Sequence, residues 1–109
     1  MLVRRINVAG ANRIIGDILE LQGPWGVVEW VGLRKDDDPP YYLMLLKTAL
    51  QSLNNARQDR AAMTIAEAIL ELTPDDTKLA EWLHRRYVRI GDMNKAEAIA
   101  RNLPSKGSA

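Results

Sequence analysis

The sequence predicts an all-α protein, an α-α superhelix of about six short antiparallel helices that form one domain over residues 1–109. Three observations predict this class. Apolar residues recur every three or four positions, which is the spacing of one helix face. The chain also matches itself at a shift of 34 residues. Finally, the segments between the apolar runs contain glycines that can end a helix and aspartates that can cap one.

The match at 34 residues divides the chain into three units, at about residues 9–42, 43–76 and 77–109. At this shift, large apolar residues fall on large ones and small residues on small ones, as superposable helix contacts require. Three sets of equivalent positions illustrate it: Ile15, Ala49 and Leu83; Leu19, Leu53 and Tyr87; Val31, Ile65 and Ile99. A single helical hairpin cannot bury its apolar stripe alone, so the units are expected to stack.

In the first unit, residues 11–22 and 25–34 are the expected helices. Gly23 ends the first of them, and Pro24 suits the first position of the second, where its missing N–H would be unpaired anyway. The apolar face of the first helix is formed by Ile14, Ile15, Ile18, Leu19 and Leu21. Trp25 and Trp30 of the second are expected in the core.

An alternative for the first unit is a β-hairpin. Residues 18–21 and 27–31 flank a Gly-Pro-Trp-Gly turn, and their valines and tryptophan favour strand locally. In that case the fold is an N-terminal β-hairpin followed by two helical hairpins. The register with the two later units favours the helices.

The second and third units give clearer helical patterns. Residues 42–55 and 60–72 are the helices of the second unit, and residues 73–76 end it. Asp76 or Thr77 starts the third unit, whose first helix has the apolar face Leu79, Leu83, Tyr87 and Ile90. Gly91 can take the left-handed conformation that ends this helix, and Asp92 can cap the next. The last helix has the face Ala96, Ile99, Ala100 and Leu103.

These residues resemble the tetratricopeptide repeat (TPR) family, whose period is 34 residues. The third unit is nearest to the family pattern, with Leu83, Tyr87, Gly91, Asp92, Lys95 and Ala96. The second keeps Leu53, Ala62 and Pro74, and the first keeps Ile15, Gly16, Gly23, Trp25 and Pro40. Departures are Leu50 and His84 where a small residue is usual, and Lys35, Ile69 and Leu103 late in the second helices. They imply an altered helix spacing and a more open superhelix.

The composition offers little catalytic equipment. The chain has no cysteine and one histidine, His84, so disulfides, thiolate chemistry and cysteine-bound zinc are excluded. The run Asp36-Asp37-Asp38 lacks the spacing of a calcium loop, and no phosphate-binding glycine motif occurs. We therefore expect no enzyme activity, no cofactor and no metal. No apolar run is long enough to span a membrane, so a cytoplasmic protein is expected.

The resemblance implies a non-catalytic adaptor that binds a partner peptide or helix in its concave groove. The first helix of each unit would line this groove. The residues carried onto it, called the groove residues below, are Arg13, Lys47, Gln51, Asn55, Lys78, Trp82, Arg85 and Arg89. The family's carboxylate clamp uses two basic residues, which Arg13 and Lys78 match, while Asp17, Thr48 and Trp82 depart from it. The basic groove residues suit acidic groups of a partner, and Trp82 suits an apolar one.

Three alternatives remain open at this point. In the first, the charged residues are part of ordinary solvated helix faces, which need no partner. The module is a structural accessory that docks on a larger complex, or self-associates through an uncapped end of the solenoid. It binds nucleic acid through the arginine-rich face Arg85, Arg86, Arg89 and Arg101. The net charge of only +1 argues against nucleic acid.

Overall fold

A computed structural model gives the structure of residues 6–101 and of residue 103. All regular structure in these residues is helical, which confirms the predicted all-α class. The remaining ends of the predicted domain, residues 1–5 and 104–109, and residue 102 lie outside the described part. The helices are α1 (Val8–Gln22), α2 (Pro24–Gly32), α3 (Pro39–Asn55), α4 (Asp59–Leu72), α5 (Thr77–Ile90) and α6 (Met93–Ala100).

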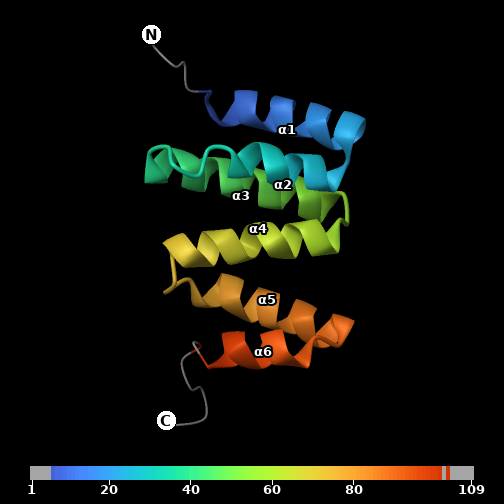
Figure 1. The fold of residues 1–109 in the computed structure, drawn as a ribbon, viewed down its shortest axis with the longest axis vertical. Helices are drawn as coiled ribbons and strands as arrows, with labels where there is room; N and C mark the ends of the chain where they lie inside the picture. Colours follow the sequence, from blue (N-terminus) through green and yellow to red (C-terminus); the bar gives the residue numbers. More distant parts are fainter. Residues whose placement is uncertain (1–5, 102, 104–109) are drawn as a thin grey trace.

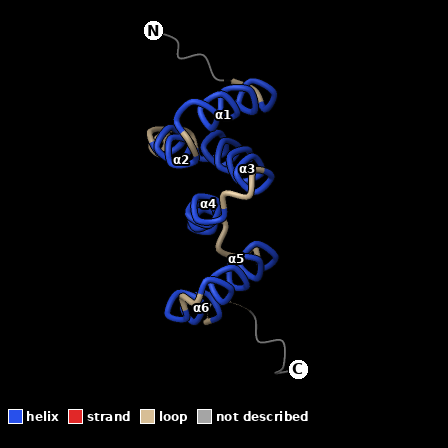
Figure 2. Tube along the Cα trace, turned by 90° about the vertical axis from the view of Figure 1, so that its right-hand side faces the viewer, coloured by secondary structure: helices blue, strands red, loops and turns tan. Residues whose placement is uncertain are grey.

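The six helices stack in chain order along the long axis of an elongated molecule of 52 × 26 × 19 Å (Figure 1). The junctions α1–α2, α3–α4 and α5–α6 lie at one edge of the stack, and α2–α3 and α4–α5 lie at the other. Seen from the side, α1, α3 and α5 lie on one side of this axis and α2, α4 and α6 on the other (Figure 2). The chain therefore forms two layers of helices.

The packing between hairpins is not uniform. Helix α3 packs against α1, and α4 packs against α2, so the first two hairpins contact each other within both layers. By proximity of Cα atoms, the third hairpin approaches the second only through the pair α4 and α5. Side chains also join α4 to α6, through Glu67 and Lys95, and α3 to α5, through Asn54 and Arg86. Neither α3 and α5 nor α4 and α6, which are all fully described, have Cα atoms within 8 Å of each other. The third hairpin is therefore attached by less backbone contact than the first.

The three hairpin junctions share a backbone feature with the period of the sequence. Among the described residues, positive φ values occur only at Gly23 (83°), Arg57 (58°) and Gly91 (82°). These residues are 34 positions apart. Gly23 and Gly91 are the C-caps of α1 and α5, and Arg57 directly follows Ala56, the C-cap of α3. At Gly91 the conformation is left-handed, and its N–H donates to the carbonyls of Tyr87 and Val88. The expected role of Gly91 is confirmed, and Asp92 caps α6 through the N–H of Lys95.

The core has two clusters, and α4 contributes to both. The larger joins α1 to α4 and includes Ile15, Val31, Ala49 and Ile65. The smaller joins α4 to the third hairpin through Met63, Ala66, Leu83, Tyr87 and Ala96. The equivalent residues Ile15, Ala49 and Leu83 are all fully buried. The repeat in the sequence thus corresponds to a repeat in burial.

The alternative β-hairpin is wrong, because the burial of residues 27–31 follows helical spacing. Val27 and Val31 are fully buried, while Glu29 between them is exposed. In a strand these three side chains would share one face, and the carboxylate would enter the core with the valines. A helix turns the carboxylate to solvent.

Four further expectations need correction. Trp25 is 54% exposed, because it lies in the first turn of α2 at the outer edge, whereas Trp30 packs against the core as expected. Leu21 is 82% exposed near the end of α1, although the buried Ile18 lies only three positions before it. Helix α6 ends at Ala100, so Leu103 lies beyond it. Helix α3 starts three residues earlier than predicted, since prolines are accepted in a first turn.

No described helix is both long and apolar enough to cross a membrane.

Candidate partner-binding site

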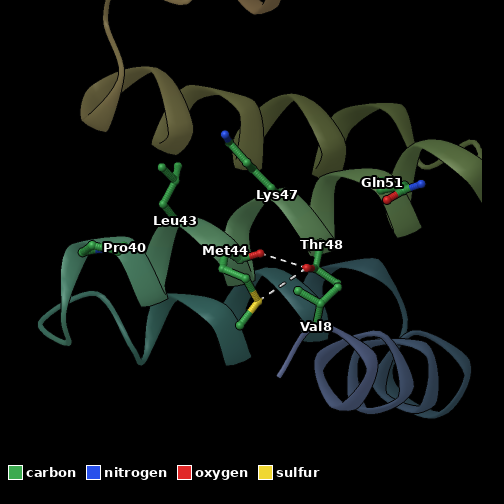
Figure 3. A pocket seen from close by; sticks show the side chains of 7 residues that line it. All are labelled: Val8, Pro40, Leu43, Met44, Lys47, Thr48 and Gln51. Atoms are coloured by element: carbon green, nitrogen blue, oxygen red, sulfur yellow. Dashed lines mark hydrogen bonds between the residues drawn. The ribbon is translucent and has the colours of Figure 1, made fainter. Parts of the chain in front are cut away.

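A cavity of about 450 Å³ lies on the side of α3 that turns toward the start of α1. We call it the α3 cavity (Figure 3). Its volume lies within the range of about 300–1,000 Å³ typical of ligand pockets. Four apolar side chains line it, together with three polar ones. The lining residues are Val8, Pro40, Leu43, Met44, Lys47, Thr48 and Gln51.

The helical repeat explains why these residues meet. Pro40, Leu43, Met44, Lys47 and Gln51 are three or four positions apart, so one face of α3 carries them all. The helix begins where Asp38 caps it, the side-chain oxygen accepting from the N–H of Tyr41 at 3.3 Å. Buried Thr48 donates from its hydroxyl to the carbonyl of Met44 at 2.8 Å, and the Met44 sulfur lies 3.7 Å away. The Thr48 hydroxyl is thus satisfied within the wall, and Lys47 and Gln51 remain exposed.

The structure brings only some of the predicted groove residues together. Lys47 and Gln51 lie side by side on the α3 cavity. The other six lie outside it, and five of these are exposed: Arg13 on α1, Asn55 at the end of α3, and Lys78, Arg85 and Arg89 on α5. All eight belong to α1, α3 and α5, the layer that contains the α3 cavity.

Helix α5 carries a basic stripe. Lys78, Arg85 and Arg89 are exposed and, by helical spacing, lie opposite the buried Ala80 and Leu83. We call these three residues the α5 stripe. The helix has four basic residues and one acidic residue, whereas residues 6–76 have six basic and eleven acidic residues. Positive charge is therefore concentrated at the C-terminal end of an otherwise acidic array.

Trp82 lies at the joint between the second and third hairpins. Its side chain is half-buried and packs against both core clusters. The guanidinium of Arg86 lies 4.8 Å from the centre of its ring and donates to Asp59 at 2.7 Å and to Asn54 at 3.4 Å. From the sequence, Arg86 was expected only as part of the arginine-rich face. Its position one turn after Trp82 was the available signal for stacking.

Two buried tyrosines have perturbed acidity. Burial raises the pKa of Tyr42, and the negative charge of Glu71 raises it further. The pKa of Tyr87 is raised first by burial, then by its hydrogen bond to Glu67, and then by the charges of Glu67 and Asp92. Both phenols therefore stay protonated at neutral pH, and the Tyr87 hydroxyl donates a hydrogen bond to Glu67. No group of three or more metal-binding side chains gathers among the described residues.

A comparison of the chain with protein-family models, with curated proteins and with solved structures found no match. The assignment of a function therefore rests on the described geometry and charge.

Proposed function

We propose that this protein is a non-catalytic protein-interaction module, built as a TPR-like superhelix, that binds a segment of a partner protein on the layer of α1, α3 and α5. The observation that carries the proposal is the α3 cavity, which places Lys47 and Gln51 beside an apolar wall on the layer that contains all eight groove residues. The junctions with positive φ every 34 residues support the TPR-like part.

The chemistry of the partner follows from these surfaces. The apolar wall of Leu43 and Met44 suits an aliphatic or aromatic side chain, and desolvating it supplies the affinity. Lys47 and the α5 stripe attract carboxylates. A segment with one apolar anchor and acidic neighbours is thus the expected ligand class.

Nucleic acid is the less favoured partner, although the α5 stripe is basic. Residues 6–76 have five more acidic than basic residues, so a phosphate backbone extending past α5 meets repulsion. A short acidic peptide segment avoids this. A steep loss of nucleic-acid affinity between low and moderate salt, at affinities above those for any peptide, would favour nucleic acid instead.

The test is a selection of displayed random peptides on the folded protein, followed by affinity measurement with variants. Lys47→Glu changes an exposed residue, so the fold is retained, and we expect about tenfold weaker binding of the selected peptides. Lys78→Ala combined with Arg85→Ala should also weaken binding and leave thermal unfolding nearly unchanged. Arg101→Glu, an exposed charge reversal at the C-cap of α6, is the matched control. Full-strength binding to both groove variants would refute the proposal.

A further inference from the structure

A second cavity lies away from α1 and α3, where all three hairpins meet. Its volume is about 190 Å³, and its lining residues belong to α2, α4, α5, the N-cap of α6 and the first turn of α6. We call it the junction cavity. Because none of its lining residues is a groove residue, it is separate from the site of the proposed function.

The apolar part of the junction cavity is incompletely covered. Trp25, Met63 and Ile90 line it, and Trp25 is 54% and Ile90 37% exposed. On α4, Met63 is accompanied by Arg60, Thr64 and Glu67, which are three and four positions apart and thus share one face. An exposed indole beside a hollow is the kind of apolar surface that a partner side chain covers.

Most charges at the cavity are already committed to each other. Glu67 accepts a hydrogen bond from the Tyr87 hydroxyl and lies 3.5 Å from the Lys95 ammonium. Asp92 accepts from the backbone N–H of Lys95 at 3.2 Å. Arg60 is exposed and has no ion pair among the described residues. Arg60 is therefore the available cation at a cavity whose lining combines three apolar side chains with these paired charges.

The volume restricts the occupant. At about 190 Å³ the cavity is smaller than the roughly 300 Å³ at which pockets for whole small molecules begin. It has the size for one side chain. An apolar side chain would contact Trp25, Met63 and Ile90, and a carboxylate nearby would pair with Arg60.

We propose that the junction cavity is a second recognition site, which takes one apolar side chain of a partner protein segment between Trp25 and Ile90 and pairs an adjacent carboxylate with Arg60. Because Arg60 has no ion pair among the described residues, its positive charge favours an acidic segment. The site draws its walls from all three hairpins, so its occupant bridges them. Binding therefore also holds the third hairpin against α4, and it does so whether or not the α3 cavity has a ligand.

The test uses a minimal probe, N-acetyl-leucine, which joins a leucine side chain to one carboxylate. In an NMR titration of the whole protein, we expect shifts at the Trp25 indole N–H and at amides of residues 60–67, and none at residues 43–51. The uncharged N-acetyl-leucinamide should bind about fivefold more weakly, the value of an exposed ion pair of about 1 kcal/mol. Arg60→Gln should remove that difference, and Lys35→Gln, an exposed charge removal elsewhere, should keep it.

Three results of the titration with the probe would overturn the proposed site. These are no shift up to the solubility limit of the probe, shifts confined to residues 43–51, and equal affinities of the acid and the amide for the wild type. Trp25→Ala should abolish the shifts at residues 60–67. Since Trp25 is half exposed, circular dichroism can verify that this variant stays folded. If the junction cavity fails while Lys47→Glu still weakens peptide binding, only the second site is lost. A concentration-dependent mass with the same shifts and no probe would assign the cavity to a second copy, against the proposal.

Discussion

At the scale of single residues, the repeated junction leaves one residue in an unfavourable conformation. Arg57 has φ 58°, where Gly23 and Gly91 have 83° and 82°. A left-handed conformation costs a residue with a Cβ about 1–2 kcal/mol, and glycine avoids most of this. Arg57 therefore occupies a position whose backbone conformation favours glycine.

We therefore predict that Arg57→Gly raises the free energy of unfolding by about 0.5–1 kcal/mol in urea denaturation. Gly91→Ala should lower it by about 1 kcal/mol, since a Cβ there meets open space and only the backbone suffers. Ala56→Gly, at φ −85°, is the control and should destabilise. A loss of stability in Arg57→Gly would mean that its side chain makes a contribution which outweighs the backbone cost.

The Tyr87 phenol gives a pH dependence. Its pKa is raised from 10.0 in the folded state, so the folded protein holds the proton more tightly than the unfolded chain. This stabilisation is complete below about pH 10 and is lost as pH rises through the folded pKa. We predict that the melting temperature falls above pH 10, less steeply in Tyr87→Phe and in Glu67→Gln, which removes the hydrogen-bonded charge. Identical slopes in all three proteins would exclude Tyr87 as the source.

At the scale of elements, side-chain caps fix where four helices begin. Asn7, Asp38, Asp76 and Asp92 each accept from a backbone N–H three residues later. Because the first N–H groups of a helix have no partner inside it, such a cap contributes about 1 kcal/mol. α2 and α4 have no side-chain cap and depend on packing.

The cap of α5 offers a matched pair of neighbours. Asp76 accepts from the N–H of Leu79 at 3.2 Å, whereas the adjacent Asp75 is exposed and caps no helix. We expect Asp76→Ala to lower the unfolding free energy by about 1 kcal/mol and Asp75→Ala to change it by less than about 0.5 kcal/mol. Equal effects in chemical denaturation would point to a loss of charge as the cause, and not to the cap.

The sequence predicts elements well where local chemistry decides them. Gly23, Gly91 and Asp92 mark the helix ends that the structure confirms, and the buried face of α5 follows from Leu83 and Tyr87. The wrong predictions concern side chains whose burial depends on the position of their helix in the stack. Leu21 has the helical spacing of a core residue, yet no helix covers it at the end of α1. Exposure of this kind depends on which neighbours exist, and local periodicity contains no such information.

The candidate site was predictable in part, again where local helix geometry decides which side chains share a face. Lys47 and Gln51 lie one turn apart on α3, so their common face follows from helix geometry alone. Trp25, by contrast, meets Ile90 across two hairpins, 65 positions along the chain. Only the stacking of the hairpins brings such residues together. The lack of close backbone contact between α3 and α5 is likewise a property of packing between units.

At the scale of the whole molecule, the smaller backbone contact of the third hairpin divides the array into two unequal parts. Helices α1 to α4 share the larger core cluster, and the third hairpin adds the smaller cluster on α4. In stacked repeats, stability is approximately a sum of terms within units and between neighbours. A weaker interface between the second and third hairpins therefore permits α5 and α6 to open while the first four helices stay folded.

Leu83 and Ile15 allow this division to be tested, because they are equivalent in the repeat and both fully buried. Replacement of either by alanine should cost about 2–5 kcal/mol locally. We predict that Leu83→Ala accelerates amide hydrogen exchange in α5 and α6 at least tenfold and leaves the most protected amides of α1 and α3 within about twofold. Ile15→Ala should instead accelerate exchange throughout α1 to α4. Equal acceleration along the whole chain by Leu83→Ala would show instead that all six helices unfold as one unit, and that the contact of α5 with α4 couples the hairpins as strongly as the packing within the first four helices.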